Sequence, residues 1–261
     1  DQDMQKNAAK MQKMQNDERG VPMVDKYALA TIAMKAGKIV ANGTALTKTT
    51  ICERISEATV ALDNAEIPGD GRYLFVDAAG YKMLRLSDEF TKSETLILKS
   101  LTKGVVGEYD NMQVVKIPSS RWPKNVNFIV AHKDSATVPV KIDDSKLHID
   151  PPGISGNLLE GRIYFDTFVF GTRCDGIYVE VCTASGKGTV CADPAIAAST
   201  GAITSTTGGA SFKYTTDGSD PRYSVTAKDG ASPDVTAAGT VIKAFAYKND
   251  CYPSAVTEKT L

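Results

Sequence analysis

The spacing of apolar residues at the start of the chain predicts helices. Residues 1–18 are strong helix formers without Gly or Pro. They carry a narrow apolar stripe, as expected of a surface helix or of part of a longer one: Met4, Ala8, Met11 and Met14. Gly20-Val21-Pro22 predicts a break, after which Asp25 can cap a second helix over 26–36. Gly37 and the turn at Asn42-Gly43 are expected to end that helix.

The next helix has the clearest pattern in the chain. Thr47 is a suitable cap, and apolar residues continue at helical spacing from Ile51 to Leu62. A turn and a short apolar strand at 72–76 follow, and the pattern at 78–86 is helical again. The order helix, turn, strand, helix indicates an α/β-type subdomain.

Beyond residue 102 the pattern changes to short apolar runs separated by turns. These runs predict strands at 114–117, 128–131, 138–142, 163–170 and 176–181. Because helices come first and strands later, the predicted fold class is α+β.

A stretch rich in Gly, Ser and Thr at 183–190 predicts a domain boundary, because no helical pattern follows it. We therefore divide the chain into 1–184 and 185–261. The second part alternates strands at 211–216 and 240–247 with turn residues, which is typical of a small β-sandwich. We expect a flexible joint with few contacts between the two parts.

Composition excludes several classes of protein. With 42% hydrophobic and 23% charged residues the chain is not disordered, and it has no apolar run long enough to span a bilayer. Its net charge of −1 provides no basic field for nucleic-acid binding. The chain opens at Asp1 directly in helix-forming sequence, which suggests that a longer polypeptide precedes it.

The five cysteines indicate neither a zinc site nor a disulfide framework. They are Cys52, Cys174, Cys182, Cys191 and Cys251, without a CxxC pair. Their odd number favours reduced thiols. Only Cys191 and Cys251, both in the C-terminal part, remain open as a disulfide pair.

Candidates for catalysis are few. His132 and His148 each precede an Asp by two residues, which in a strand only places both side chains on one solvated face. The segment 185–189 is similar to a phosphate-binding loop but lacks its first Gly and its final Ser or Thr, so it is interpreted as a linker. Trp122 is a plausible ligand contact by composition, but such a residue is more often a loop anchor or a subunit-interface residue. We expect no catalytic residue, cofactor or metal ion, and therefore no enzyme.

The aspartates of the C-terminal part raise the question of calcium. They are Asp217, Asp220, Asp229 and Asp234, and they lack the alternating spacing of a calcium loop. Turn formation explains them better, with a positive φ at Gly218 and an Asx-turn at Asp220. The predicted signature turn is structural and comprises Tyr214, Asp217, Gly218, Asp220 and Pro221.

Several segments, taken in order, resemble tailed-phage major capsid proteins. They are Val21-Pro22-Met23-Val24-Asp25-Lys26-Tyr27, Leu62 to Pro68, Gly71-Arg72-Tyr73-Leu74-Phe75-Val76, Tyr81-Lys82-Met83-Leu84, Gly104 to Asp110, Ile117-Pro118-Ser119-Ser120, Gly161-Arg162-Ile163-Tyr164 and Gly176 to Glu180. The resemblance covers residues 20–182. It implies a major-capsid fold with axial and peripheral subdomains that assembles into pentamers and hexamers of an icosahedral shell. That family also has an N-terminal arm and an extended loop, which we expect to be missing here.

The C-terminal part resembles a different family. Phe212 to Pro221, followed by 240–246 and Pro253-Ser254, is similar to the immunoglobulin-like domain at the C-terminus of chitobiases. The resemblance implies a fold and no hydrolase activity.

The resulting hypothesis is a structural capsid subunit of a bacteriophage virion. It self-assembles in the host cytoplasm and carries an outward immunoglobulin-like decoration domain. Its expected partners are copies of itself, then portal, scaffold or decoration proteins, and glycans bound weakly by the C-terminal domain; no membrane partner is expected. The alternative is a bacterial surface adhesive or carbohydrate-binding protein.

Overall fold

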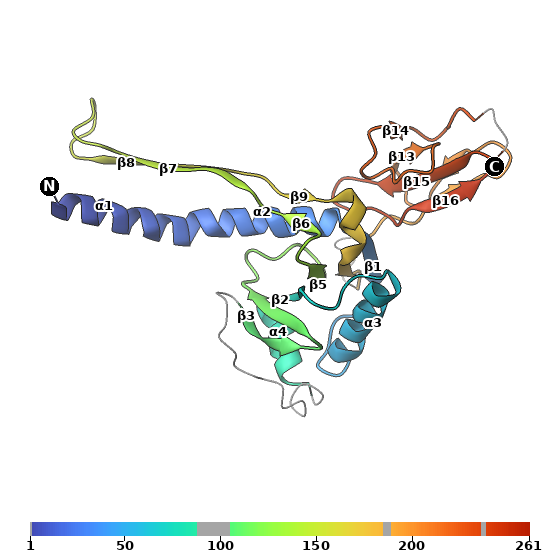
Figure 1. The fold of residues 1–261 in the computed structure, drawn as a ribbon, viewed down its shortest axis with the longest axis horizontal. Helices are drawn as coiled ribbons and strands as arrows, with labels where there is room; N and C mark the ends of the chain where they lie inside the picture. Colours follow the sequence, from blue (N-terminus) through green and yellow to red (C-terminus); the bar gives the residue numbers. More distant parts are fainter. Residues whose placement is uncertain (1, 88–104, 185–188, 236–238) are drawn as a thin grey trace.

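The computed structural model describes residues 2–87, 105–184, 189–235 and 239–261 (Figure 1). The chain is a mixed α+β structure. A six-stranded sheet with helices on both faces forms its centre, a long helix and a long hairpin extend away from the sheet, and short strands form the C-terminal part (Figure 1). The α+β prediction is therefore confirmed.

The central sheet combines parallel and antiparallel pairs in the order β1-β10-β5-β2-β4-β3. The strands are β1 (Lys38–Asn42), β2 (Arg72–Asp77), β3 (Val105–Tyr109), β4 (Met112–Ile117), β5 (Val126–His132) and β10 (Ile177–Cys182). β1 is parallel to β10 and β2 is parallel to β4, whereas the pairs β10 with β5, β5 with β2, and β4 with β3 are antiparallel. Sequence-distant strands thus lie side by side in the middle of the sheet.

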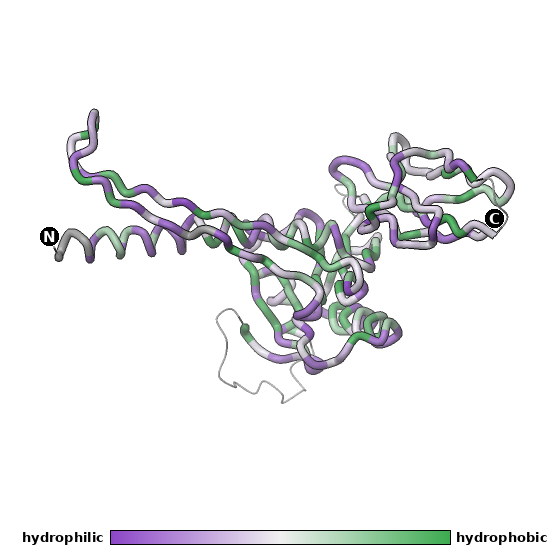
Figure 2. The backbone as a smooth tube through the Cα atoms, turned by 45° about the horizontal axis from the view of Figure 1, so that its top comes forward, coloured by the Kyte–Doolittle hydropathy of each residue, from purple (hydrophilic) through white to green (hydrophobic). Residues whose placement is uncertain are grey.

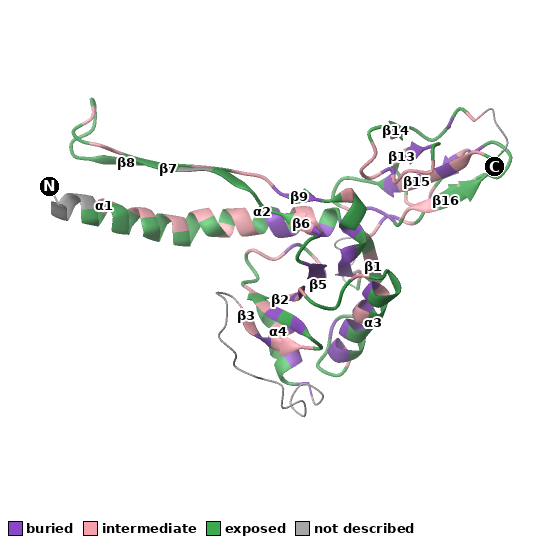
Figure 3. Ribbon diagram, in the orientation of Figure 1, coloured by how far each residue is buried: buried purple, intermediate pink, exposed green. Residues whose placement is uncertain are grey.

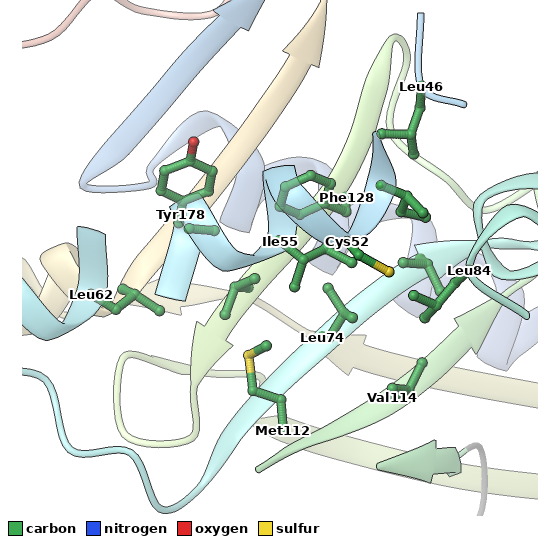
Figure 4. Close-up of a cluster of buried hydrophobic side chains, with 14 residues drawn as sticks. Leu46, Cys52, Ile55, Leu62, Leu74, Leu84, Met112, Val114, Phe128 and Tyr178 are labelled. Atoms are coloured by element: carbon green, nitrogen blue, oxygen red, sulfur yellow. The ribbon is translucent and has the colours of Figure 1, made fainter. Parts of the chain in front are cut away.

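Alternate residues of the central strands face two separate cores. Leu74 of β2 and Phe128 of β5 pack with α3 (Ile51–Asn64) and α4 (Ala78–Arg85) in the first core (Figure 4). Their neighbours Phe75 and Ile129 face the second core, which the C-terminal half of α2 (Val21–Met34) covers. The period-2 alternation of a strand therefore lets one sheet hold two helical layers.

A buried ion pair joins the first helical layer to the sheet. Arg54 of α3 and Glu180 of β10 are 8% and 1% exposed, with 3.1 Å between Nη1 and Oε1. Asn127 Nδ2 donates to the same carboxylate at 2.6 Å, and Arg54 also donates to the Thr44 carbonyl. These partners compensate for removing both charges from water.

The arm consists of one long helical segment and one long hairpin. We define it as residues 2–34 together with 136–170. The helical segment comprises α1 (Gln2–Gln15), a π-helical segment η1 (Asn16–Gly20) and α2. The hairpin comprises β7 (Val140–His148) and β8 (Leu158–Phe165), with β6 (Ala136–Thr137) and β9 (Phe168–Val169) at its base. Both lie beside one another over most of their length (Figures 1 and 2).

The predicted helix break at Gly20-Val21-Pro22 is wrong, because the helix continues through it. The Val21 N–H bonds to the Asn16 carbonyl, five residues back, so the turn widens into a π-helix. Pro22 follows in the first turn of α2, where its missing N–H costs little. A local change of pitch therefore replaces the break.

Two further local expectations need correction. No strand is expected from the sequence between Gly37 and the Asn42-Gly43 turn, but the structure has β1 there, paired with β10. The single strand expected at 163–170 is divided into β8 and β9, because the Asp166 side chain accepts from the Thr167 N–H between them. The helices predicted from 51 and at 78–86 are confirmed as α3 and α4.

The C-terminal part forms two small sheets that share a core. One has the order β14-β13-β15-β16 and the other pairs β11 with β12. The bounds are β11 (Ala195–Ile196), β12 (Ile203–Thr204), β13 (Ser211–Thr215), β14 (Lys228–Asp229), β15 (Val241–Tyr247) and β16 (Thr257–Thr260). Ile203, Tyr214 and Ala244 are buried together between them. The strands predicted at 211–216 and 240–247 are confirmed as β13 and β15.

The ion pair yields a stability prediction. Glu180→Gln leaves Arg54 buried without its counter-charge and should lower the free energy of unfolding by about 3–5 kcal/mol. Guanidinium denaturation measures the loss. The control is Glu258→Gln, which removes the exposed Lys243–Glu258 pair and should cost about 0–1 kcal/mol. Equal small losses in the two variants would contradict a structural role for the buried pair.

Candidate interaction surfaces

Most exposed large apolar side chains lie on the arm. Fourteen of the eighteen found among the described residues belong to it: Met11, Met14, Val21, Met23, Tyr27, Met34, Val138, Val140, Ile149, Ile154, Leu158, Tyr164, Phe168 and Phe170. The burial colours show the contrast, since buried residues gather on the central sheet and the outer arm is largely exposed (Figure 3). The arm is therefore a candidate binding surface.

Specific contacts hold the helix and the hairpin of the arm together. Tyr27 Oη donates to Asp166 Oδ1 at 3.1 Å, which raises the pKa of the tyrosine, and its ring meets Phe165 edge-on. A Cβ at Gly20 would lie 2.9 Å from Ile163 Cδ1, so glycine lets the helix approach the hairpin without moving the end of that side chain. These contacts leave the exposed apolar side chains of the arm uncovered.

A groove runs between α1 and the hairpin. It has a volume of about 520 Å³, and its lining includes Ala8, Gln12, Leu147 and Leu159. Gln12 Oε1 is buried there and accepts no hydrogen bond from the described residues. The outer arm is thus incompletely packed.

The predicted signature turn contains two side-chain-bonded aspartates. Asp217 accepts from the Ser219 N–H and from the hydroxyls of Ser219 and Thr226, which lowers the pKa of Asp217 to about 2. Gly218 has a φ of +76°, so the positive φ expected from the sequence is confirmed. Asp220 accepts from the Arg222 N–H in the expected Asx-turn.

The other two residues of this turn are buried. Tyr214 lies in the C-terminal core with 7% exposure, and Pro221 is buried at the start of the segment that meets α2. The turn therefore lies between the core of the C-terminal part and its contact with the rest of the chain.

Arg222 joins the C-terminal part to the end of α2. Its guanidinium donates to the Ala36 and Gly37 carbonyls at 3.2 and 2.9 Å and pairs with Asp220 at 2.7 Å. Tyr223 Oη donates to the Lys35 carbonyl. Tyr223 thus satisfies the carbonyl of Lys35, the C-cap residue of α2, while Arg222 satisfies the two carbonyls that follow it and places a cation near the C-terminal end of the helix dipole. We call Asp220, Arg222 and Tyr223 the latch.

The surroundings of the latch affect its ionisation. Burial raises the pKa of Asp220, but hydrogen bonds from Arg222 outweigh it, so that the pKa is lowered. Burial also raises the pKa of the Tyr223 phenol. At neutral pH the latch therefore holds a charged Asp–Arg pair and a neutral phenol.

A second contact forms at the other side of the joint. Tyr252 packs in the second core, and its hydroxyl donates to the Lys124 carbonyl at 2.8 Å. Trp122 Nε1 donates to the Val126 carbonyl, and both rings line a groove of about 940 Å³ that also includes Lys26. With the latch, these contacts show that the expected joint with few contacts is wrong.

Sequence reasoning missed Arg222 and Tyr223. Their only local signal is their position directly after Asp220-Pro221, and nothing in that position indicates a target near residue 36. Trp122, by contrast, anchors its loop, as one of its three interpretations predicts.

The two histidines differ. His132 is buried, with its Nε2 3.0 Å from the Asp70 carbonyl and its Nδ1 accepting from the Asp134 N–H. The expectation of a solvated face is wrong for His132, because the loop at Asp70 covers the end of β5. His148 is exposed and hydrogen-bonds Glu160, which lowers the pKa of Glu160.

The remaining candidates are easily located. Most of the loop-like segment 185–189 lies outside the described residues. In the part of the chain that the structure describes, no three His, Cys, Asp or Glu side chains gather as ligands of a metal ion, and no helix is long and apolar enough to cross a membrane. All five cysteines are free thiols.

Comparison with known proteins finds similarity only among solved structures, since no protein-family model and no curated protein matches the chain. A chain of Mycobacterium phage Che8 is 19% identical, with a TM-score of 0.47 over 61% of this chain and 58% of that one. A chain of the capsid structure of cyanophage P-SCSP1u is 15% identical, with a TM-score of 0.42 over 65% of each chain. A chain of the mature capsid of bacteriophage PhiM1 is 11% identical, with a TM-score of 0.45 over 65% of this chain and 63% of that one. The match thus spans less than two thirds of each solved chain.

A test of the turn uses Gly218→Val. A β-branched residue at a φ of +76° is strained, so the free energy of unfolding should fall by about 1–3 kcal/mol. Gly208→Val is the matched control, because its φ is not in the left-handed region and a side chain there meets open space. Thermal unfolding measures both. Unchanged stability together with altered calcium or glycan binding would identify the turn as a binding site.

A test of the latch uses Arg222→Met. The change leaves two carbonyls and a half-buried carboxylate without their donor and should cost about 2–3 kcal/mol. Arg173→Met, which removes an exposed pair with Asp134, is the control and should cost less than about 1 kcal/mol.

The wild type and Arg222→Met can also be compared across pH. Because the pKa of Asp220 is lowered from its ordinary 3.8, its stabilisation is complete above that pH and is lost as pH falls below it. Thermal unfolding from pH 5 down to about pH 2 should show a steeper acid loss in the wild type than in Arg222→Met. Parallel curves would rule out the Asp220–Arg222 pair as a source of stability.

Proposed function

We propose that this chain is a structural subunit of a bacteriophage icosahedral capsid and not an enzyme. Its copies assemble into pentamers and hexamers in the host cytoplasm, and the virion capsid is its final location. The class of particle comes from the sequence resemblance over residues 20–182. The observation that carries assembly is the exposed apolar arm.

The arm cannot bury its own apolar surface. It is one helix thick with a two-stranded hairpin on one side, and such a ribbon has no second layer to cover it. Side chains as large as Tyr164 and Met11 stay more than half exposed on it. Copies of the same chain are the partners always present at matching concentration, so a repeated contact between arms and neighbouring subunits accounts for this surface.

The charge of the chain also suits self-association. Thirty basic and thirty-one acidic residues leave a net charge of −1. Copies brought together in a lattice therefore meet little overall repulsion. This supports contact between like chains without specifying its geometry.

The C-terminal part is proposed as an immunoglobulin-like decoration domain on the outer surface of the shell. Its fold comes from the resemblance. The latch and Tyr252 support a fixed projection, because Arg222, Tyr223 and Tyr252 each donate a hydrogen bond to residues of the first part. Tyr214, Asp217, Gly218, Asp220 and Pro221 are proposed to act structurally there. A weak contact with glycans, and contacts with portal, scaffold or other decoration proteins, belong to the same proposal.

The test is assembly of the complete gene product that contains this chain. Electron microscopy after expression should show shells or capsomers. Tyr164→Glu places a charge in the expected interface and should reduce the yield of particles at least about tenfold, the effect of 1.4 kcal/mol per contact. Val225→Glu, at a fully exposed position of the C-terminal part, should leave the yield unchanged. Circular dichroism verifies that both variants fold.

Other outcomes would contradict the proposal. A monomeric product that is retained by glycan resins would favour the adhesive protein instead. An epitope inserted at Val225 tests orientation in the same particles: antibody should bind intact particles. Binding only after disruption would place the C-terminal part inside.

A further inference from the structure

Cys191 and Cys251 are distant in sequence but lie diagonally across one short β-bridge. Val190 and Tyr252 form an isolated parallel β-bridge. The Cys191 N–H donates to the Tyr252 carbonyl, and the Tyr252 N–H donates to the Thr189 carbonyl, each at 2.9 Å. The backbone on both sides of the pair is therefore held in register.

The two thiols share one face of this bridge. In a paired strand the neighbours of the bridging residues point to the opposite side. Cys191 follows Val190 and Cys251 precedes Tyr252, so both side chains point that way. Cys251 Sγ lies 3.0 Å from Thr189 Oγ1, and Thr189 is two residues before Cys191 on the same face.

The ionisation of Cys191 agrees with this geometry. The pKa of the Cys191 thiol is raised to about 11. Burial is the largest cause, followed by the charge of Cys251 and a hydrogen bond with it. Cys191 is 3% exposed, whereas Cys251 is only half-buried. An external reagent therefore meets Cys251 first.

We propose that Cys191 and Cys251 form a disulfide when the protein meets an oxidising low-molecular-weight disulfide. The Cys251 thiolate attacks one sulfur of the reagent, forming a mixed disulfide and releasing one thiol. Cys191 loses its proton and attacks the Cys251 sulfur, which releases the second thiol. Two protein thiols are oxidised and one disulfide reagent is reduced to two thiols.

The disulfide would strengthen the joint. It closes the chain from 191 to 251, which contains β11 to β15, and so restricts the unfolded state. It also holds the chain beside Tyr252, whose hydroxyl reaches Lys124 in the other part of the protein. The inference goes beyond the proposed function and does not depend on it.

Peptide mapping of the full chain tests the proposal. After incubation with oxidised glutathione, alkylation and trypsin digestion, peptides 188–213 and 249–259 should appear as one linked species, and free thiols should fall from five to three. The midpoint of thermal unfolding should rise by about 5 °C or more relative to reduced protein.

Two variants control the experiment. Cys251→Ser keeps a hydroxyl near Thr189 and should lose both the linked peptide and the thermal shift. Cys182→Ser, another half-buried thiol, should behave as wild type. Five free thiols after oxidation, or a link between other cysteines, would overturn the proposal. Because the peptide map uses the wild-type chain, it decides the question even if a variant fails to fold.

Discussion

Strand β10 is the element on which the rest of residues 2–184 depends. It is buried on both faces and bonded on both edges, to β1 and to β5. On one face Tyr178 stacks on Phe128 and Glu180 pairs with Arg54 of α3, while Ile177 and its alternate neighbours fill the second core. A strand in this position must satisfy every polar group internally. The Arg54–Glu180 pair is how the one buried acid of β10 meets that requirement.

Backbone hydrogen bonds at both ends of β10 connect it to neighbouring elements. The segment before it supplies the Cys174 carbonyl to the Gly37 N–H at the end of α2. The residues at and after its end bond to Asn125 and Asn42. The segment after α2, β1 and the loop before β5 are thus positioned relative to the same strand.

The arm and the joint differ in how completely each buries its surface within one chain. At the joint, Arg222 satisfies carbonyls at the end of α2, so two parts with different sequence character are held by polar contacts. The arm has internal contacts near Tyr27 but leaves most of its large apolar side chains exposed. In the proposed shell, neighbouring subunits supply the layer that the arm lacks, while the joint is already complete within one chain.

The sequence by itself determined the elements whose signals are local. The periodicity of α3 and α4, the apolar run of β2 and the positive φ at Gly218 follow from neighbouring residues alone. The tertiary structure decided what those signals leave open. β1 exists because β10 lies beside it, the helix continues past Gly20 through a π turn, and His132 is buried by a loop sixty residues earlier.

The same reason explains why the latch was missed while its turn was predicted. Periodicity and turn chemistry report which faces are apolar and where the chain reverses, but they carry no information about which distant segment will lie opposite. Arg222 reaches the Ala36 and Gly37 carbonyls only when the segment after α2 is brought next to it. Pairing between segments far apart in sequence depends on the packing of the whole chain, and only the tertiary structure contains it.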